Sequence, residues 1–212
     1  MLPLKQMSTR KAFTLVELLV TISIVAVLAA LVLAGWSSTR KLSLRTHCLQ
    51  NLKSVGLAIN LYTGDHDGIL PGPTYWSQKS MPDDSRFLAA YLGPYLGYTI
   101  SLTAGNLSKV DTFRCPSATW SELSYIACQQ IKRGTIPNKS PWGDLSSGAP
   151  PENLMPLRMA MLSSLGINLS SQWAIRDSYG SPPADNPGLG MRGPSRHGKT
   201  SVLFFDGHVA AE

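Results

Sequence analysis

Three polar side chains near the C-terminal end have the types and the spacing of metal ligands. The stretch RHGKTSVLFFDGHV at residues 196–209 contains His197, Asp206 and His208. An aspartate and a histidine two residues apart on a hairpin could reach one divalent ion, and His197 could join them from the opposite strand end. The simpler interpretation, which we favour, is that Asp206 and Gly207 form a turn and that His197 bonds a loop carbonyl group.

The cysteines offer a second kind of chemistry. Cys48, Cys115 and Cys128 all follow a long apolar segment. If that segment spans a membrane, the cysteines lie in an oxidising compartment, where one disulfide can form and one thiol is left. A bond between Cys115 and Cys128 would join two neighbouring strands, whereas a bond between Cys48 and Cys115 would tie a domain to its helix. A chain with three reduced thiols is the third interpretation.

Other chemical motifs are weak or missing. The sequence GDHDG at residues 64–68 resembles part of a calcium-binding loop, but it lacks the downstream glutamate of a full loop. The sequence contains no nucleophile elbow, phosphate-binding loop or catalytic pair of acids. We therefore expect a protein that is not an enzyme and needs no cofactor, with calcium or another divalent ion as the remaining candidate ligand.

The apolar segment contains one acid. Glu17 is the only charged residue in residues 13–36, a stretch that as a helix would span roughly 36 Å and so exceed a hydrocarbon core of about 30 Å. A carboxylate inside a membrane costs about 2.5–3.5 kcal/mol near the centre, so it needs a partner. Lys5, Arg10 and Lys11 precede the segment and favour a cytoplasmic N-terminus with the C-terminal part outside.

Length and charge restrict the number of domains and the classes of partner that we expect. The 212 residues suffice for one domain and an appendage, and 43% of them are hydrophobic whereas 15% are charged. The net charge is +6, and three of the positive charges precede the apolar segment. The rest of the sequence carries no basic stripe interleaved with aromatic residues, so we expect no nucleic-acid partner.

The stretch KAFTLVELLVTISIVAVLAAL resembles the N-terminal signal of type IV pilins and type II secretion pseudopilins. The resemblance implies that a prepilin peptidase cleaves between Ala12 and Phe13 and methylates the new amine of Phe13. It also implies that Glu17, the fifth residue of the mature chain, acts in assembly. Ala12 stands where the family usually has glycine.

Electrostatics explains why an acid is favourable at position 17 in a protein of this family. After cleavage, the positive amine of Phe13 lies one turn from Glu17 at the start of a helix, where the helix dipole favours an acid. The carboxylate can also neutralise the amine of a neighbouring subunit, which sets the register between helices because a mispaired acid stays unsatisfied in lipid.

The C-terminal stretch at residues 196–209 carries a second resemblance. It is similar to the signature of a pilin-like group found in planctomycetes, in which a histidine and a spacer precede Asp-Gly and a following His-Val. Residues 48–71 and the Cys-Pro of FRCPSA are also similar to that group. Eight residues separate His197 from Asp206 here, one fewer than in the group. Because the resemblance includes Cys48 and Cys115, it favours a disulfide between these two cysteines.

The element pattern predicts an α+β protein, in which a long hydrophobic pilin-like helix packs on a small antiparallel sheet with long loops. We expect a leader at residues 1–12, a helix at 13–62 that spans the membrane at 13–36, and an extracytoplasmic domain at 63–212. The strand candidates are residues 112–115, 124–128 and the hairpin at 200–210, a short helix is expected at 155–166, and the main loops at 132–153 and 177–196.

These features predict a pilin or pseudopilin subunit of the bacterial inner membrane, assembled into a periplasmic or surface filament of a type II secretion or type IV pilus-like system. Its expected partners are the prepilin peptidase, other pilin-like subunits, the inner-membrane assembly platform and lipid. One alternative is a single-span binding or metal-site protein that uses the signal only for placement. Another is a secreted enzyme behind an ordinary signal peptide, for which VLAG at residues 32–35 could serve as the cleavage site.

Overall fold

The computed structural model describes residues 13–118, 123–133, 136–143, 145, 154–179 and 196–212. Two compact units divide the chain, an N-terminal unit of residues 1–40 and a C-terminal unit of residues 41–212. One helix, α1 (Leu15–Asp65), begins in the first unit and continues into the second. It ends at Asp65, three residues beyond the predicted end, where Gly68 adopts a positive φ of 77° that a helix cannot contain.

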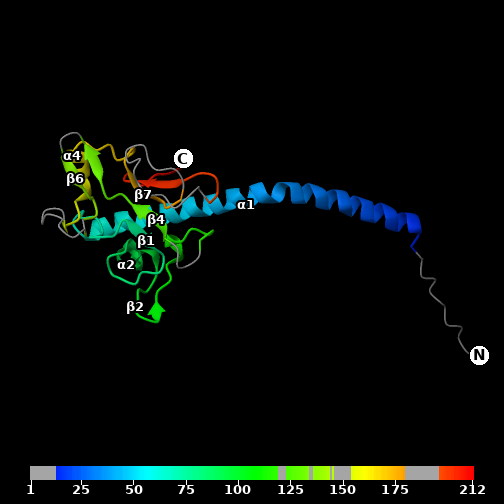
Figure 1. The fold of residues 1–212 in the computed structure, drawn as a ribbon, viewed down its shortest axis with the longest axis horizontal. Coiled ribbons are helices and arrows are strands. Elements are labelled where there is room, and N and C mark those ends of the chain that lie inside the picture. Colours follow the sequence, from blue (N-terminus) through cyan, green and yellow to red (C-terminus); the bar gives the residue numbers. More distant parts are fainter. Residues whose placement is uncertain (1–12, 119–122, 134–135, 144, 146–153, 180–195) are drawn as a thin grey trace, which may run out of the picture. The chain divides into compact units, whose positions relative to one another are not determined.

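The C-terminal unit is built on a five-stranded sheet (Figure 1). All neighbouring strands are antiparallel, which confirms the predicted α+β class with its antiparallel sheet. The strands follow the order β1-β4-β7-β8-β9, with bounds Ser77–Lys79, Leu123–Ala127, Trp173–Asp177, Ser201–Phe204 and Val209–Ala211.

The C-terminal hairpin is confirmed. Strands β8 and β9 pair through Ser201 with Ala211, and the turn between them contains Asp206 and Gly207. Gly207 has a φ of 86°, which is the left-handed conformation that made Asp-Gly a turn signal. The predicted strand at residues 124–128 is also present, as β4.

Two other expectations about local structure are wrong. Residues 112–115 are not a strand, because Asp111–Phe113 form a short 3-10 helix, η2. The expected loop from residue 132 contains a small ladder of β5 (Ile131–Arg133) and β6 (Ile136–Lys139), and β7 lies in a region without a strand signal. All five residues of β7 are buried, so the strand shows no alternation of apolar and polar residues.

Short elements complete the C-terminal unit. The helix expected near residues 155–166 is α4 (Met159–Ser164), and it ends before Gly166, whose φ is 68°. The other elements are α2 (Leu88–Leu92), η1 (Pro94–Leu96) and a ladder of β2 (Leu102–Thr103) with β3 (Asn106–Leu107).

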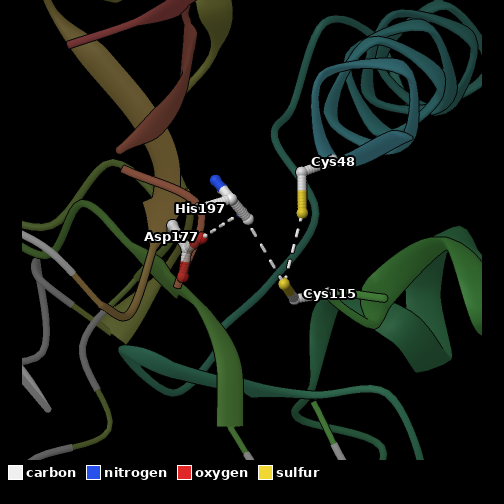
Figure 2. Close-up of side chains that lie close together, drawn as sticks. All are labelled: Cys48, Cys115, Asp177 and His197. Atoms are coloured by element: carbon white, nitrogen blue, oxygen red, sulfur yellow. Dashed lines mark hydrogen bonds and ion pairs between the residues drawn. The ribbon is translucent and has the colours of Figure 1, made fainter. Parts of the chain in front are cut away.

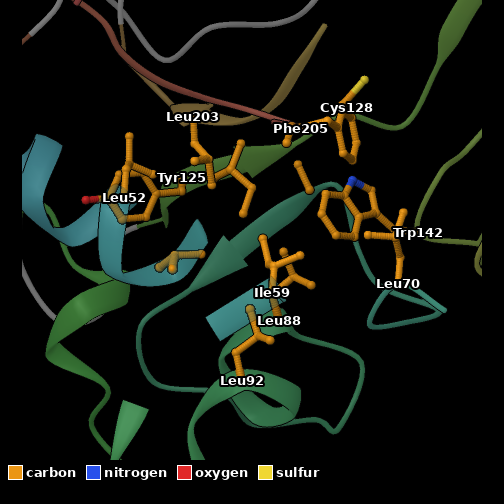
Figure 3. Close-up of a cluster of buried hydrophobic side chains, with 14 of the residues drawn as sticks. Leu52, Ile59, Leu70, Leu88, Leu92, Tyr125, Cys128, Trp142, Leu203 and Phe205 are labelled. Carbon is orange, nitrogen blue, oxygen red and sulfur yellow. The ribbon is translucent and has the colours of Figure 1, made fainter. Parts of the chain in front are cut away.

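The core forms where the last part of α1 meets the sheet (Figure 3). Leu52, Val55 and Ile59 recur at steps of three and four residues, so they share one helix face, and that face is buried. A Cβ atom at Gly56 would lie 2.8 Å from a methyl carbon of Leu203 on β8. The absence of a side chain at Gly56 therefore lets the helix approach the sheet closely.

Replacement of Leu52 tests how much this contact stabilises the chain. Leu52 is fully buried, so Leu52→Ala should lower the free energy of unfolding by about 2–5 kcal/mol and lower Tm by at least about 5 °C. Leu57→Ala on the same helix is the matched control, because Leu57 is 61% exposed and its loss should cost less than about 0.5 kcal/mol. Circular dichroism melts of the full chain in detergent measure both. Equal losses would contradict the assigned helix face.

Candidate functional site

The N-terminal unit presents an apolar helix surface. Leu15–Leu33 of α1 has a mean hydropathy of 2.7 and none of it is buried within the chain, and its length and composition suffice to cross a membrane. Phe13, which precedes the helix, is 80% exposed. Ala12, on the other side of the expected cleavage site, lies outside the described residues. Such a surface needs lipid or other apolar helices around it, because its exposure to water is unfavourable.

Glu17 has a local role that the sequence analysis missed. Its carboxylate oxygen Oε2 accepts a hydrogen bond of 2.9 Å from the backbone N–H of Thr14 and one of 3.0 Å from the Thr14 hydroxyl. The backbone N–H of Glu17 donates to the same hydroxyl oxygen at 3.2 Å. This reciprocal pattern is a capping box, and its signal in the sequence is a threonine followed three residues later by a glutamate.

A second group of functional side chains lies inside the C-terminal unit. Cys48, Cys115, Asp177 and His197 converge from four segments, and their candidate ligand atoms all lie within 4.8 Å of one another (Figure 2). All four residues are buried. This group, which we call the buried cluster, brings His197 together with two of the three cysteines.

Each member of the buried cluster is positioned by its own element. Cys48 lies on α1, and Asn51, one turn further along, donates a hydrogen bond of 3.1 Å to the carbonyl oxygen of Arg114 beside Cys115. Asp177 ends β7. His197 lies in the turn before β8, and the next residue, Gly198, has a φ of 91° that favours glycine.

The distances within the cluster form a connected set. The sulfur atoms of Cys48 and Cys115 lie 3.3 Å apart and share a hydrogen bond, with both thiols free. Nε2 of His197 lies 3.8 Å from the Cys115 sulfur and 3.4 Å from Oδ2 of Asp177. The disulfide expected between Cys48 and Cys115 stays a prediction.

Burial and mutual contact shift the pKa values of the cluster. The hydrogen bond from Cys48 and then the contact with His197 lower the pKa of the Cys115 thiol, whereas the pKa of Cys48 is raised by that hydrogen bond and by burial. Contact with Asp177, and then with Cys115, raises the pKa of His197 to about 9. Burial raises the pKa of Asp177. The cluster therefore favours a negatively charged Cys115 thiolate next to a positively charged His197 imidazolium.

The other predicted ligands do not join His197. Asp206 and His208 form a pair in the β8–β9 turn, where Nδ1 of His208 lies 2.6 Å from Oδ1 of Asp206. Strand β8 separates this pair from His197, and its four residues alone extend about 13 Å. Oδ1 of Asp206 also accepts the backbone N–H of His208 at 3.1 Å, so the aspartate supports the turn.

The remaining candidates lie apart from the cluster. Cys128 belongs to the main hydrophobic core, whereas Cys48 and Cys115 form a separate buried group with Ala118. In the expected calcium-loop fragment, Oδ2 of Asp65 accepts a hydrogen bond of 3.0 Å from the hydroxyl of Tyr95. Asp177 carried no signal in the sequence, because a single aspartate in an unrecognised buried strand has no ligand spacing.

Comparison with known proteins finds a similarity in one region of the chain, at its N-terminus. The family model for the prokaryotic N-terminal methylation motif matches residues 7–33, which include the expected cleavage site and Glu17. No curated protein and no solved structure is significantly similar to the chain. The match covers the N-terminal signal, and the C-terminal unit lies outside it.

The capping box gives a prediction about the first turn of α1. Thr14→Ala and Glu17→Ala each remove one side of the box, so amide hydrogens in that turn should exchange about fivefold faster, which corresponds to about 1 kcal/mol. Glu17→Gln keeps an acceptor oxygen and should change the rates little. Hydrogen exchange of the full chain in detergent measures this. Unchanged rates in both alanine variants would show that the box does not stabilise the turn.

Proposed function

We propose that the chain is a pilin-like structural subunit, made as a precursor and processed by a prepilin peptidase. The observation that carries this proposal is the match of the prokaryotic N-terminal methylation motif to residues 7–33. Cleavage between Ala12 and Phe13 releases the basic leader and gives a chain that begins with a methylated Phe13. The mature protein is anchored in the bacterial inner membrane through residues 13–36, with the C-terminal unit outside the cytoplasm.

Assembly follows from the surface that the N-terminal helix exposes. Leu15–Leu33 is apolar and unburied, so a bundle of such helices can replace lipid with other subunits while every backbone hydrogen bond stays within its helix. The C-terminal units then form the surface of a filament in a type II secretion or type IV pilus-like system. The assembly platform and other pilin-like subunits are its partners.

Glu17 provides the selective contact in this filament. Its carboxylate already accepts two hydrogen bonds from Thr14, so it is held at the first turn in a defined direction. The amine of Phe13 from a neighbouring subunit can add the charge that the carboxylate lacks in a low-dielectric bundle. A subunit in the wrong register would leave this acid without a cation.

The mature N-terminus tests the processing step. We expect mass spectrometry and terminal sequencing of the protein from membranes to give a chain that begins at Phe13 and carries one methyl group. A terminus at Gly35 would instead establish an ordinary secretory signal and contradict the proposal. A terminus at Met1 in cells with an active prepilin peptidase would also contradict it.

Substitution of Glu17 tests the assembly step. Glu17→Gln keeps the capping box but removes the charge, so it should lower the filament yield at least about tenfold, because one unpaired charge in lipid costs about 2.5 kcal/mol or more. Thr14→Ala is the matched control, since it weakens the cap and keeps the carboxylate, and its yield should fall by less than about threefold. The yield is measured as the amount of the protein in filaments sheared from the cells, and resistance to alkaline extraction verifies membrane insertion. An unchanged yield in Glu17→Gln would refute the role of the charge.

A further inference from the structure

We propose that Cys48, Cys115, Asp177 and His197 bind one zinc ion, which links α1 to the sheet of the C-terminal unit. The buried cluster is not needed for cleavage, methylation or membrane insertion, which depend on the N-terminal unit. The proposal is therefore independent of the function proposed above.

The geometry of the buried cluster fits a tetrahedral ion. With zinc bonds of about 2.3 Å to sulfur and about 2.0 Å to nitrogen or oxygen, a tetrahedron places two sulfurs roughly 3.8 Å apart, sulfur and nitrogen roughly 3.5 Å apart, and nitrogen and oxygen roughly 3.3 Å apart. The separations of 3.8 Å between Cys115 and His197 and 3.4 Å between His197 and Asp177 lie within about 0.3 Å of these values, and all the donor atoms lie within 4.8 Å of one another. The two sulfurs are 3.3 Å apart and would separate by about 0.5 Å around the ion. Figure 2 shows the four side chains as a chain of contacts that runs from Cys48 through Cys115 and His197 to Asp177.

The donor set selects among metals. Thiolate sulfur and imidazole nitrogen are ligands that zinc prefers, whereas calcium and magnesium require oxygen donors almost exclusively. A carboxylate adds an oxygen ligand that zinc accepts and copper(I) disfavours. Two thiolates, one carboxylate and a neutral imidazole around a divalent ion leave a net charge of only −1, which greatly lowers the cost of burying the three acids together.

The carboxylate of Asp177 supports the same assignment. Its Oδ1 accepts the backbone N–H of Tyr179 at 3.1 Å. Its Oδ2 is buried, and apart from the contact with His197 it has no hydrogen-bond partner among the described residues. A buried carboxylate oxygen without a donor is unfavourable, and a bound cation removes that cost. Tyr125 pairs with Asp177 across the sheet and is fully buried, so it shields this side of the cluster from water.

A disulfide accounts for less of the cluster than a metal ion does. A covalent bond between Cys48 and Cys115 would involve two of the four converging groups and would leave the Asp177 and His197 side chains buried beside an uncharged sulfur pair. Zinc binding uses all four groups and releases the protons of those thiols that are protonated without metal.

The proposed ion would have a structural role, because it would join the helix to the sheet. Four protein ligands fill a tetrahedral shell, which is the arrangement of structural zinc sites rather than of catalytic ones. The ion would join α1, the segment after η2, the end of β7 and the turn before β8. The helix that anchors the chain is thereby fixed to the sheet at a point next to its hydrophobic contact.

The first test uses the full wild-type chain, purified in detergent without chelators or added metal. Elemental analysis should give about one zinc ion per chain, and Cys48 and Cys115 should resist alkylation until a chelator is added. Removal of the ion should lower Tm, and added zinc should restore it. Cobalt(II) in the emptied site should give the visible absorption of tetrahedral thiolate coordination.

Variants assign the ligands. Cys115→Ser and Asp177→Asn should each lower the zinc affinity at least about tenfold. Cys128→Ser is the matched control, because Cys128 is a buried cysteine outside the cluster, and Asp206→Asn is the control for the exposed Asp206–His208 pair. Both controls should keep the wild-type affinity.

Three results would overturn the proposal. An intact, unreduced chain with a Cys48–Cys115 disulfide and no zinc would assign the cluster to a covalent bond. A chain with free thiols that binds neither zinc nor cobalt would show that the cluster is a hydrogen-bonded group alone. Zinc that survives in Cys115→Ser but is lost in Asp206→Asn would place the ion in the β8–β9 turn. The wild-type measurements decide the first two results even if a ligand variant fails to fold.

Discussion

The C-terminal unit depends on the packing of one face of α1 against the sheet. Leu52, Val55 and Ile59 remove that face from water, and Gly56 permits a close approach to Leu203. Because hydrophobic burial stabilises roughly in proportion to area, a helix that is half apolar stripe and half polar surface has one favourable orientation. That orientation also fixes where Cys48 points, so the packing of the core determines the location of the buried cluster.

The two halves of α1 differ in how their apolar side chains are distributed and buried. Leu15–Leu33 has apolar residues on all sides and none of them is buried in the part of the chain that the structure describes, so the segment suits lipid or a bundle of like helices. Residues 41–65 have one apolar face and bury it in their own domain. Each half also contains polar side chains with defined partners: Glu17 accepts hydrogen bonds from Thr14 in the first half, and Cys48 contacts Cys115 in the second.

Patterns between near neighbours in the sequence predicted much of the fold. The long apolar run predicted the N-terminal helix, which forms as Leu15–Asp65, and Asp206-Gly207 predicted the hairpin. The prediction failed where burial on two sides removed the pattern, as in β7, and where a short strand signal at residues 112–115 competed with the turn of η2. At the N-terminus the T-x-x-E spacing was available and predicts the capping box, in which Glu17 stabilises the start of the helix.

The sequence by itself determined the length and apolar character of the N-terminal helix, the position of its single acid and the processing motif, because these depend on residues within a few turns of one another. Only the tertiary structure decided that His197 meets Cys48, Cys115 and Asp177 instead of Asp206 and His208. Residues at the two ends of β8 are kept apart by the extended strand, whereas antiparallel pairing brings the turn before β8 to the end of β7. Such long-range neighbours follow from strand order and register, which no local spacing in the sequence encodes.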